Sequence, residues 1–561
     1  MPLSKKLILS ALALCAAAFA APALAVDGTP DPSFGIGGEA FITPNDVEAR
    51  ELQPYAVIEQ PDGKLLVAGQ RNKYIASSPF DPHMRAMLAR FNADGSPDTS
   101  FGNIGGIPGV LVLGDLVPNT GMQIIEAMQR LDDGSIVVAG TASAFGPLNG
   151  FVLKLHDDGT MDHTFGDNGV VLLPTTFLHA LAVDSQGRLL VAGEESVDTI
   201  SHAIVVRLGA DGSPDSSFGP SADGYARLAW DGVDGQGGYL TSLAVTANDG
   251  VVAAGSYEVY GSGLGSDFAV ARLDADGLLD PAFNGSGWRV FHSSINASNI
   301  NGINRLLLDA SGAMVFAGYY NVDETGMNLV LGALAADGSS DPAFGDAATP
   351  GYQPILLVPD AWSRYASGLE RQSDGKLVVS VSYALPGKSD FLAFRTSATG
   401  VLDETFADGG IFDHDLAPDG IYSDLSAMTL DALGRPILTG RSERTSPIVE
   451  LAVMRLTNDS VGPTLRTIGG SVDGLVGTGL VLQQNGGDDL AIRRDGTFTF
   501  ATALADGSAY AVTVLTQPGS PAQTCSVDNG SGTVGGSDVA DVHVICVTDP
   551  SDVVFANGFE R

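Results

Sequence analysis

Short apolar runs separated by glycine-containing turns recur along most of the chain. In Gln60–Gly69 (QPDGKLLVAG), an Asp-Gly turn is followed by an apolar run that ends in Ala-Gly. Asp-Gly between apolar runs is a strong hairpin signal, because glycine adopts the positive φ that a tight turn needs. Runs of about four to eight residues rich in Val, Leu, Ile and Phe are typical of β-strands. The pattern therefore predicts an all-β chain.

Three short motifs alternate in a fixed order. The first is D-x-x-F-G, as in Asp98–Gly102, and the copies Asp280–Asn284 and Asp403–Ala407 lack its glycine. The second is the turn with its apolar run, and the third is an apolar run that ends on a basic residue, as in Leu88–Phe91 (LARF). The phenylalanines of the first motif recur roughly 60 residues apart, which is the signature of a repeat architecture. They are Phe34, Phe101, Phe165, Phe218, Phe283, Phe344 and Phe406.

One repeat unit has room for four short strands. In Gly38–Asn92 these are EAFIT, YAVIE, KLLVAG and MLARF. Four antiparallel strands per unit, with little helical periodicity between them, predict a propeller blade. The seven units predict a seven-bladed β-propeller over residues 26–459. The pattern leaves open which motif forms the innermost strand and whether N- and C-terminal strands share one blade.

A family resemblance agrees with this architecture. The stretches RFNADGSPDTSFG and QPDGKLLVAG resemble the delta-60 repeat, a bacterial propeller-type repeat whose family function is not established. The resemblance covers residues 26–459 and is weaker in the fifth to seventh units, where Ala333 replaces the basic residue and Ala407 the glycine. It implies the fold and no particular activity.

Beyond residue 459 the pattern changes. Residues 460–468 predict a linker, and residues 469–548 alternate short strands with turns, which predicts a small β-sandwich. Within it, GLVLQQNGGDDLAIRRDGTFTFATAL resembles Ig-like modules appended to bacterial secreted proteins. The tail, residues 549–561, ends in VVFANGFER and resembles a short F-x-x-G-F-E tail on secreted proteins of some gammaproteobacteria. Whether this tail acts in sorting is left open.

The N-terminus predicts export. Lys5 and Lys6 precede an apolar stretch that ends in Ala23-Leu24-Ala25, so residues 1–25 fit a signal peptide cleaved after Ala25. No later apolar run approaches the roughly 20 residues of a membrane-spanning helix. We therefore expect an extracellular or cell-surface protein without membrane insertion, with the periplasm as the alternative compartment.

The charge narrows the choice of partners. The chain has 29 basic and 66 acidic side chains, a net charge of −37. Such a field repels phosphate backbones, so nucleic acid is not an expected partner. The expected partner is an extracellular ligand, a glycan or a protein, and the sequence leaves the oligomeric state open.

Cleavage of the signal peptide would remove Cys15 and leave Cys525 and Cys546. These two flank predicted strands joined by a glycine-rich turn, Asn529–Gly536, so the strands can run side by side. In an exported chain such a pair predicts a disulfide. No Cys/His spacing typical of zinc is present.

The candidate chemistry is sparse. The recurrent basic residue, present in six of the seven repeats, is predicted to be structural and to pair with the aspartate of D-x-x-F-G, because a half-buried cation needs a partner. Two acidic turns partly match a calcium loop, but they lack one acidic position and the terminal bidentate Glu, so a plain hairpin turn is the favoured explanation. The calcium candidates are Asp94, Asp98, Asp274, Asp276 and Asp280. No other cofactor is predicted.

No catalytic residue can be assigned from the sequence. It contains no G-x-S-x-G motif, and its histidines lack H-E-x-x-H spacing. The favoured hypothesis is a secreted binding or structural propeller whose variable loops meet the ligand. The candidate loops are Asn72–His83, Thr141–Asn149, Tyr257–Ser266 and Tyr383–Ser389. The alternative is an extracellular hydrolase or lyase with its site at the mouth of the propeller channel, since fold does not decide function.

Overall fold

The computed structural model describes residues 27–44, 49–73, 83–102, 107–114, 122–143, 148–197, 200–228, 236–259, 265–291, 300–321, 326–345, 349–357, 363–385, 389–417, 422–445, 447–458, 465–505, 509–535 and 537–548. The predicted signal peptide (1–25), much of the predicted linker (460–464) and the predicted tail (549–561) lie outside the described residues. Every helix or strand assigned in these ranges is a β-strand, as the sequence predicted. None of the described segments forms a helix of the length and apolarity needed to cross a membrane.

Consecutive strands pair antiparallel in groups of four that follow the chain, and one parallel bridge between Glu51 and Val449 joins the first group to the last. The first is β2 (Ala49–Glu59), β3 (Leu65–Lys73), β4 (His83–Phe91) and β5 (Val110–Val112). The second is β6 (Met122–Arg130), β7 (Ile136–Ser143), β8 (Asn149–Leu155) and β9 (Val170–Pro174). The third is β10 (Thr176–Val183), β11 (Leu189–Val197), β12 (Ile200–Leu208) and β13 (Tyr225–Arg227).

The next three sheets repeat this order. They are β14 (Gln236–Val245), β15 (Val251–Val259), β16 (Ser266–Leu273) and β17 (Trp288–Phe291); β18 (Asn301–Leu308), β19 (Met314–Asn321), β20 (Met327–Leu334) and β21 (Tyr352–Ile355); and β22 (Ser363–Arg371), β23 (Leu377–Ala384), β24 (Phe391–Thr396) and β25 (Ile411–His414). In each sheet the Asp-Gly-type turn joins the first strand to the second. A tight turn with glycine between two apolar runs favours such a hairpin.

The last sheet combines the two ends of the repeat region. It consists of β26 (Ser423–Leu430), β27 (Pro436–Thr445) and β28 (Ile448–Arg455), with β1 (Glu39–Ile42) paired antiparallel to β28. The sequence unit Gly38–Asn92 is therefore offset by one strand from the sheets. Its EAFI segment is β1 and joins the last sheet, whereas YAVIE, in β2, begins the first.

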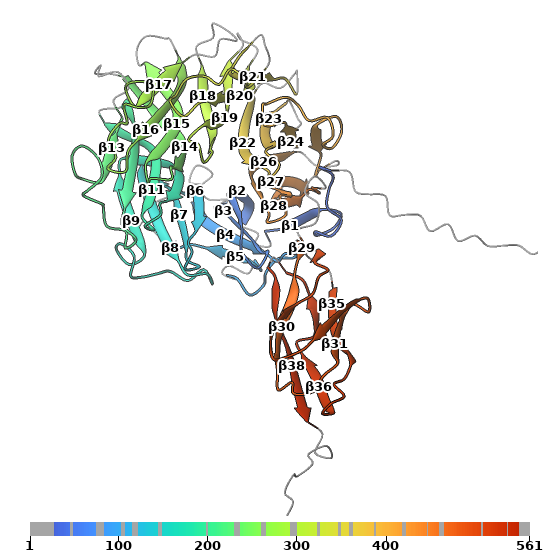
Figure 1. Cartoon of the computed structure of the whole chain (residues 1–561). Helices are drawn as coiled ribbons and strands as arrows, with labels where there is room; N and C mark the ends of the chain where they lie inside the picture. Colours follow the sequence, from blue (N-terminus) through green and yellow to red (C-terminus); the bar gives the residue numbers. More distant parts are fainter. Residues whose placement is uncertain are drawn as a thin grey trace, which may run out of the picture.

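The first strand of each sheet lies innermost. Contacts run from β2 to β6, β10, β14, β18, β22 and β26, and then from β26 back to β2. Figure 1 shows the sheets around a common centre, with β2, β6, β14, β22 and β26 labelled near it. The strand that precedes the Asp-Gly-type turn is thus the inner strand, and the arrangement is that of a β-propeller.

Buried Phe–Gly contacts join neighbouring sheets. Each D-x-x-F-G phenylalanine is buried and packs on a turn glycine of the next sheet, where a Cβ atom would lie only 2.5–3.1 Å from the ring. The pairs are Phe34–Gly95, Phe101–Gly159, Phe165–Gly212, Phe218–Gly277, Phe283–Gly338, Phe344–Gly400 and Phe406–Gly28. Because the last pair joins the sixth sheet to an N-terminal turn, one kind of contact is repeated around the whole cycle.

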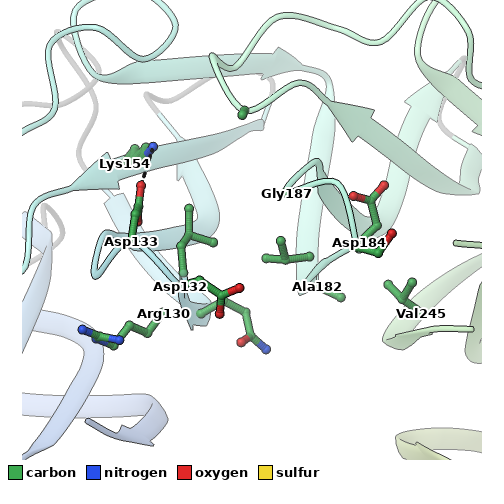
Figure 2. Close-up of a pocket in the computed structure, with 13 residues that line it drawn as sticks. Arg130, Asp132, Asp133, Lys154, Ala182, Asp184, Gly187 and Val245 are labelled. Atoms are coloured by element: carbon green, nitrogen blue, oxygen red, sulfur yellow. Dashed lines mark ion pairs between the residues drawn. The ribbon is translucent and has the colours of Figure 1, made fainter. Parts of the chain in front are cut away.

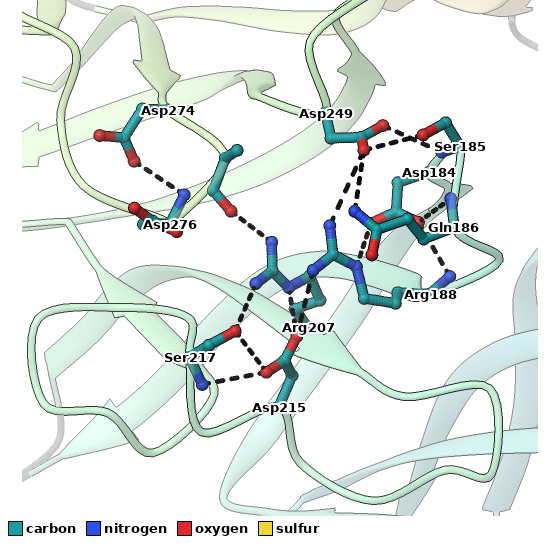
Figure 3. Close-up of polar contacts among 11 residues, drawn as sticks. Asp184, Ser185, Gln186, Arg188, Arg207, Asp215, Ser217, Asp249, Asp274 and Asp276 are labelled. Atoms are coloured by element: carbon teal, nitrogen blue, oxygen red, sulfur yellow. Dashed lines mark hydrogen bonds and ion pairs between the residues drawn. The ribbon is translucent and has the colours of Figure 1, made fainter.

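The recurrent arginine pairs with the D-x-x-F-G aspartate, as predicted. Arg207 Nε donates to Asp215 Oδ2 at 2.8 Å, its guanidinium lies over the Phe218 ring at 4.5 Å, and its Nη1 donates to the Ala275 carbonyl of the next sheet (Figure 3). Equivalent Nε–Oδ2 bonds of 2.8–2.9 Å join Arg90–Asp98, Arg272–Asp280, Arg395–Asp403 and Arg455–Asp31. The cation is therefore a structural tie within and between sheets.

The C-terminal residues form two further four-stranded sheets and a short pair. One sheet has the order β33 (Gly496–Thr499), β30 (Ile468–Asp473), β38 (Val539–Thr548) and β36 (Gln523–Asp528). The other is β32 (Asp488–Ile492), β31 (Leu480–Gln484), β35 (Ala509–Thr516) and β37 (Ser531–Thr533), and β29 (Leu465–Arg466) pairs with β34 (Leu504–Ala505). Apolar side chains from both larger sheets share one core.

The predicted disulfide is present in this part. Cys525 and Cys546 face each other across the antiparallel strands β36 and β38, with their Cα atoms 4.0 Å apart, and their sulfur atoms are bonded.

Candidate functional site

All seven inner strands break register at one equivalent residue. In β10, for example, Leu178 pairs with Gly193 and Ala180 with Ala192, so His179 is left without a partner across the ladder. Such a β-bulge re-aims a side chain and is frequent beside functional sites. The bulge residues are Tyr55, Glu126, His179, Thr241, Asn304, Ser367 and Ser426.

Every bulge residue is polar, and all seven lie at the same position along their strands relative to the following turn. Since these strands line the centre of the ring, the repeat brings seven polar side chains to one level there. Six of them are partly exposed, and only Ser367 is buried. We call this set the central polar ring.

A glutamate–histidine pair lies in the central polar ring. His179 Nδ1 is 2.8 Å from Glu126 Oε2, and both side chains are about one-fifth exposed. A carboxylate at Nδ1 fixes this nitrogen as the protonated one when the ring is neutral, which leaves Nε2 as an acceptor. The imidazole also contacts the ring of Phe177 and lies 6.3 Å, centroid to centroid, from Tyr239. The pair therefore offers an oriented acid–base group beside aromatic rings.

Tyrosines surround this pair. Burial raises the pKa of Tyr55 above its ordinary value, and the nearby Glu126 raises it further. Burial likewise raises the pKa of Tyr319, whose hydroxyl lies 3.1 Å from that of Tyr239 and whose ring meets Tyr365 edge to face. These phenols stay protonated at neutral pH and can donate hydrogen bonds.

Arg305 brings a positive charge to the same region. It follows the bulge residue Asn304 on β18, and its guanidinium donates to the carbonyls of Asn304 (2.9 Å) and Ser367 (3.1 Å). Burial lowers the pKa of Arg305, whereas Glu126 and Glu370 act to raise it. Glu126 lies on β6, which β10 and β14 separate from β18, so its charge acts on Arg305 through space and not by contact.

Glu370 on β22 is the second carboxylate near Arg305. Burial raises the pKa of Glu370 to about 7, against the opposing influence of Arg305. The side chain therefore changes its charge near neutral pH, within the electrostatic reach of the arginine.

The five calcium candidates have hydrogen-bond or ion-pair partners within the chain or lie in exposed turns. Asp98 and Asp280 pair with Arg90 and Arg272. Asp94 accepts bonds from Ser96, and Asp274 accepts the amide of Asp276 (Figure 3). In the part of the chain that the structure covers, no three His, Cys, Asp or Glu side chains form a metal-binding group. Calcium binding stays a prediction.

Two pockets lie between neighbouring sheets, at equivalent places in the repeat. The larger, about 610 Å³, has Arg130, Asp133, Lys154 and Asp184 in its wall (Figure 2). The other, about 480 Å³, includes Arg272, Asp274 and Asp280. Their walls are built largely from the structural turns and ion pairs of the repeat, and we assign them no ligand.

The four candidate loops lie partly outside the described residues, at 74–82, 144–147, 260–264 and 386–388.

The sequence contains a signal for the central polar ring, but this signal is not a catalytic or metal-binding motif. A triplet of one polar, one small and one apolar residue precedes each inner turn. Its copies are Tyr55-Ala56-Val57, Glu126-Ala127-Met128, His179-Ala180-Leu181, Thr241-Ser242-Leu243, Asn304-Arg305-Leu306, Ser367-Gly368-Leu369 and Ser426-Ala427-Met428. In one copy Arg305 occupies the position of the small residue, so it differs from the other six copies in both size and charge.

Comparison with known proteins agrees with the architecture. Residues 60–101, 131–165, 185–218 and 247–283 match the family described as "Domain of unknown function (DUF5122) beta-propeller", so the repeats are of propeller type. A search of curated proteins found no match.

Several solved structures resemble this chain at low sequence identity and low TM-score. A protein of unknown function from Dyadobacter fermentans shares 15% identity, covering 64% of this chain and 96% of that one, with a TM-score of 0.36. Chaetomium thermophilum Sqt1, bound to the N-terminus of a ribosomal protein, shares 12% (74% and 98% covered, TM-score 0.37). The polysaccharide lyase Uly1 shares 10% (77% and 98% covered, TM-score 0.37). At these TM-scores none of the three bears on the function of this chain.

Proposed function

We propose that this chain is an exported binding protein that holds its ligand in the central polar ring. In this proposal residues 1–25 direct export, and the propeller is one closed ring of seven blades. The C-terminal sheets form an Ig-like module that is independent of ligand binding. The ligand is an extracellular glycan or protein segment that reaches the ring centre.

The observation that carries the proposal is the contrast between two positions of the same repeat. The outer position varies little: its aspartate and phenylalanine recur in all seven sheets, and its basic residue is arginine in five, Lys154 in one and replaced by Ala333 in another, which suits a structural tie. The bulge position is polar in every sheet but varied, with Tyr, Glu, His, Thr, Asn and Ser. A structural need would repeat one residue, whereas an asymmetric ligand needs different groups around it. Few convergent polar groups beside aromatic rings are typical of ligand sites.

A second candidate function is catalysis by a hydrolase or lyase at the same place. The hydrogen bond between Glu126 and His179 favours it, because a carboxylate-oriented imidazole is a common general base. Arg305 and the protonated tyrosines could then stabilise developing negative charge. Binding comes first because it requires only the recognition groups that the ring provides.

The test is a glycan and peptide array probed with the purified mature chain and two ring variants, Glu126→Gln and His179→Ala. A ligand of the central polar ring should bind at least tenfold more weakly to both. His414→Ala is the matched control, since His414 also meets a carboxylate, Glu39, at 2.7 Å, but lies on the outer strand β25. A ligand that binds all four proteins equally would contradict the proposal. Mass spectrometry of the bound ligand after incubation would distinguish catalysis, which cleaves it, from binding.

A further inference from the structure

Arg305 is an exception within the repeat. The position after the bulge is small in six sheets, where it is Ala56, Ala127, Ala180, Ser242, Gly368 and Ala427. Small residues suit this level because the inner strands converge at the centre of a propeller. In the fifth sheet the position is Arg305, whose long cationic side chain has no counterpart in the other six. A residue that departs from a structural repeat in size and charge is the best candidate for a function specific to this chain.

The guanidinium of Arg305 is held in a fixed orientation. Its Nη1 and Nε donate to the carbonyls of Asn304 and Ser367, which belong to adjacent inner strands. These two bonds fix the plane of the group and leave Nη2 without a bond to a described residue. A planar guanidinium with a fixed orientation is suited to a carboxylate, which it binds with two parallel hydrogen bonds.

The positive charge of Arg305 lacks a contacting counter-charge in the described part of the chain. Glu126 and Glu370 influence it through space, but neither forms an ion pair with it. Glu126 is bonded to His179, and the burial-raised pKa of Glu370, about 7, leaves much of that carboxyl protonated at neutral pH. Partial burial of a cation without contact to an anion is costly, and the lowered pKa of Arg305 has the same cause. An anionic ligand group would remove this cost.

The inner strands also carry aromatic and hydrogen-bonding side chains. Two residues before the bulge, on the same face of their strands, lie Phe177, Tyr239 and Tyr365, all partly exposed. The bulge level itself adds Thr241, Asn304 and Ser426. The Asn304 side-chain oxygen is buried and has no hydrogen-bond partner among the described residues. This combination suits the apolar ring faces and the many hydroxyls of a sugar.

From this geometry we infer that the central polar ring recognises an acidic saccharide, a sugar bearing a carboxylate, through Arg305. The inference rests on the proposed binding function and adds the ligand class. The carboxylate pairs with the guanidinium, the sugar ring packs against the aromatic side chains, and the hydroxyls bond to the bulge residues. The phenol of Tyr55 supplies a further donor.

The test is calorimetric titration of the mature chain with a panel of acidic saccharides. The panel contains galacturonate, glucuronate and mannuronate oligomers and N-acetylneuraminate, each paired with its uncharged methyl ester. At least one acid should bind at least tenfold more tightly than its ester. Arg305→Gln should abolish this preference, and Arg305→Lys should retain part of it. The control is Arg289→Gln on the outer strand β17, whose side chain bonds to the Gly338 carbonyl and Ser340. This control should leave the preference unchanged.

Other results would overturn the inference. Equal binding of acid and ester, no binding of any acid, or an unchanged preference in Arg305→Gln would each contradict it. Binding of a neutral glycan that still depends on His179 would refute the acidic ligand and leave the proposed function intact. Binding that is unaffected by both Arg305→Gln and His179→Ala would refute both. An unfolding midpoint of Arg305→Gln close to that of the parent protein shows that the variant is folded. If Arg305→Gln does not fold, Arg305→Lys is compared with the parent protein in its place.

Discussion

At the scale of single residues, the turn glycines that touch a phenylalanine of the neighbouring sheet combine two constraints. Gly277 has φ of +77°, a conformation that residues with a Cβ rarely adopt. A Cβ on Gly277 would also lie 2.7 Å from the Phe218 ring and from the Gly219 amide nitrogen. Neither neighbour can move easily, because Phe218 is fully buried and Gly219 donates to the Asp276 carbonyl.

Gly277→Ala should therefore destabilise the propeller by about 2–4 kcal/mol, from strain at positive φ and from overpacking. Gly187→Ala is the matched control, since Gly187 has φ of +75° but no atom within 4 Å of an added Cβ. The control should cost only about 1 kcal/mol. Urea unfolding of both variants measures the difference, and equal losses would show that the contact with Phe218 is unimportant.

The residue-scale contacts also show what the sequence could predict. The Arg–Asp pair was predictable, because both partners lie in adjacent motifs of one segment and a half-buried cation needs a partner. The Phe–Gly contact was not, because Phe218 and Gly277 belong to different sheets. Likewise, Glu126 influences the charge of Arg305 through space from a distant sheet, and no spacing along the chain encodes that relation.

At the scale of elements, the inner strand is where the repeat differs from sheet to sheet. The apolar pattern could not show which strand of a blade is innermost, because every strand of the blade is an apolar run bounded by turns. Its bulge was hidden for a related reason, because a bulge depends on the partner strand. The polar–small–apolar triplet is the only local trace of it. Glu370 shows the energetic consequence of placing a carboxylate on such a strand.

Glu370 predicts a pH dependence of stability. Its pKa is raised by burial from an ordinary 4.5 to about 7 in the folded protein. Between these values the folded state holds a proton that the unfolded state releases, so the stability due to this group is complete below about pH 4.5 and is lost as pH rises through 7. Glu370→Gln removes this loss. The free energy of unfolding of the variant, relative to that of the parent, should therefore be higher at pH 8 than at pH 5, by up to about 3 kcal/mol.

The measurement is the free energy of unfolding of parent and variant at both pH values. Glu404→Gln, at an exposed turn position, is the control and should show no such difference. A Glu370→Gln effect that is the same at pH 5 and pH 8 would contradict the assignment. The same carboxyl affects the central polar ring, because its deprotonation places a negative charge near Arg305.

At the scale of the whole molecule, the propeller is closed by the N-terminal segment. The strand β1 pairs with β28, Asp31 pairs with Arg455, and Gly28 packs on Phe406. The sequence predicted seven units but left the closure open. Seven units can be counted whichever strand begins a blade, so the count does not show whether the two ends of the repeat region share a sheet. The structure resolves this through three contacts that join the two ends of the repeat region.

Closure can be tested with Gly28→Ala. In the closed ring a Cβ on Gly28 would lie 2.5 Å from the Phe406 ring, and its φ is +79°. The variant should then lose about 2–4 kcal/mol, as Gly277→Ala does inside the ring. If the N-terminal segment did not dock, the substitution would cost close to nothing. Urea unfolding, with Gly187→Ala again as control, separates the two outcomes.

We expect the C-terminal sheets, but not the propeller, to depend on the disulfide for their stability. All three cysteines of the chain lie at positions 15, 525 and 546, so the repeat region contains none. Cys525 and Cys546 are 21 residues apart and join β36 to β38 within a small core. Closing a loop of this size is worth about 3 kcal/mol in the chain-entropy model, a large share of the stability of a small domain.

Reduction, or the double variant Cys525→Ser with Cys546→Ser, should therefore lower the melting temperature of the C-terminal sheets and leave that of the propeller unchanged. Differential scanning calorimetry of the full chain, with and without reductant, resolves the two transitions. The double variant should match the reduced parent and show no further response to reductant. A common shift of both transitions would mean that the two parts unfold as one cooperative unit, and an unchanged trace would contradict a stabilising disulfide.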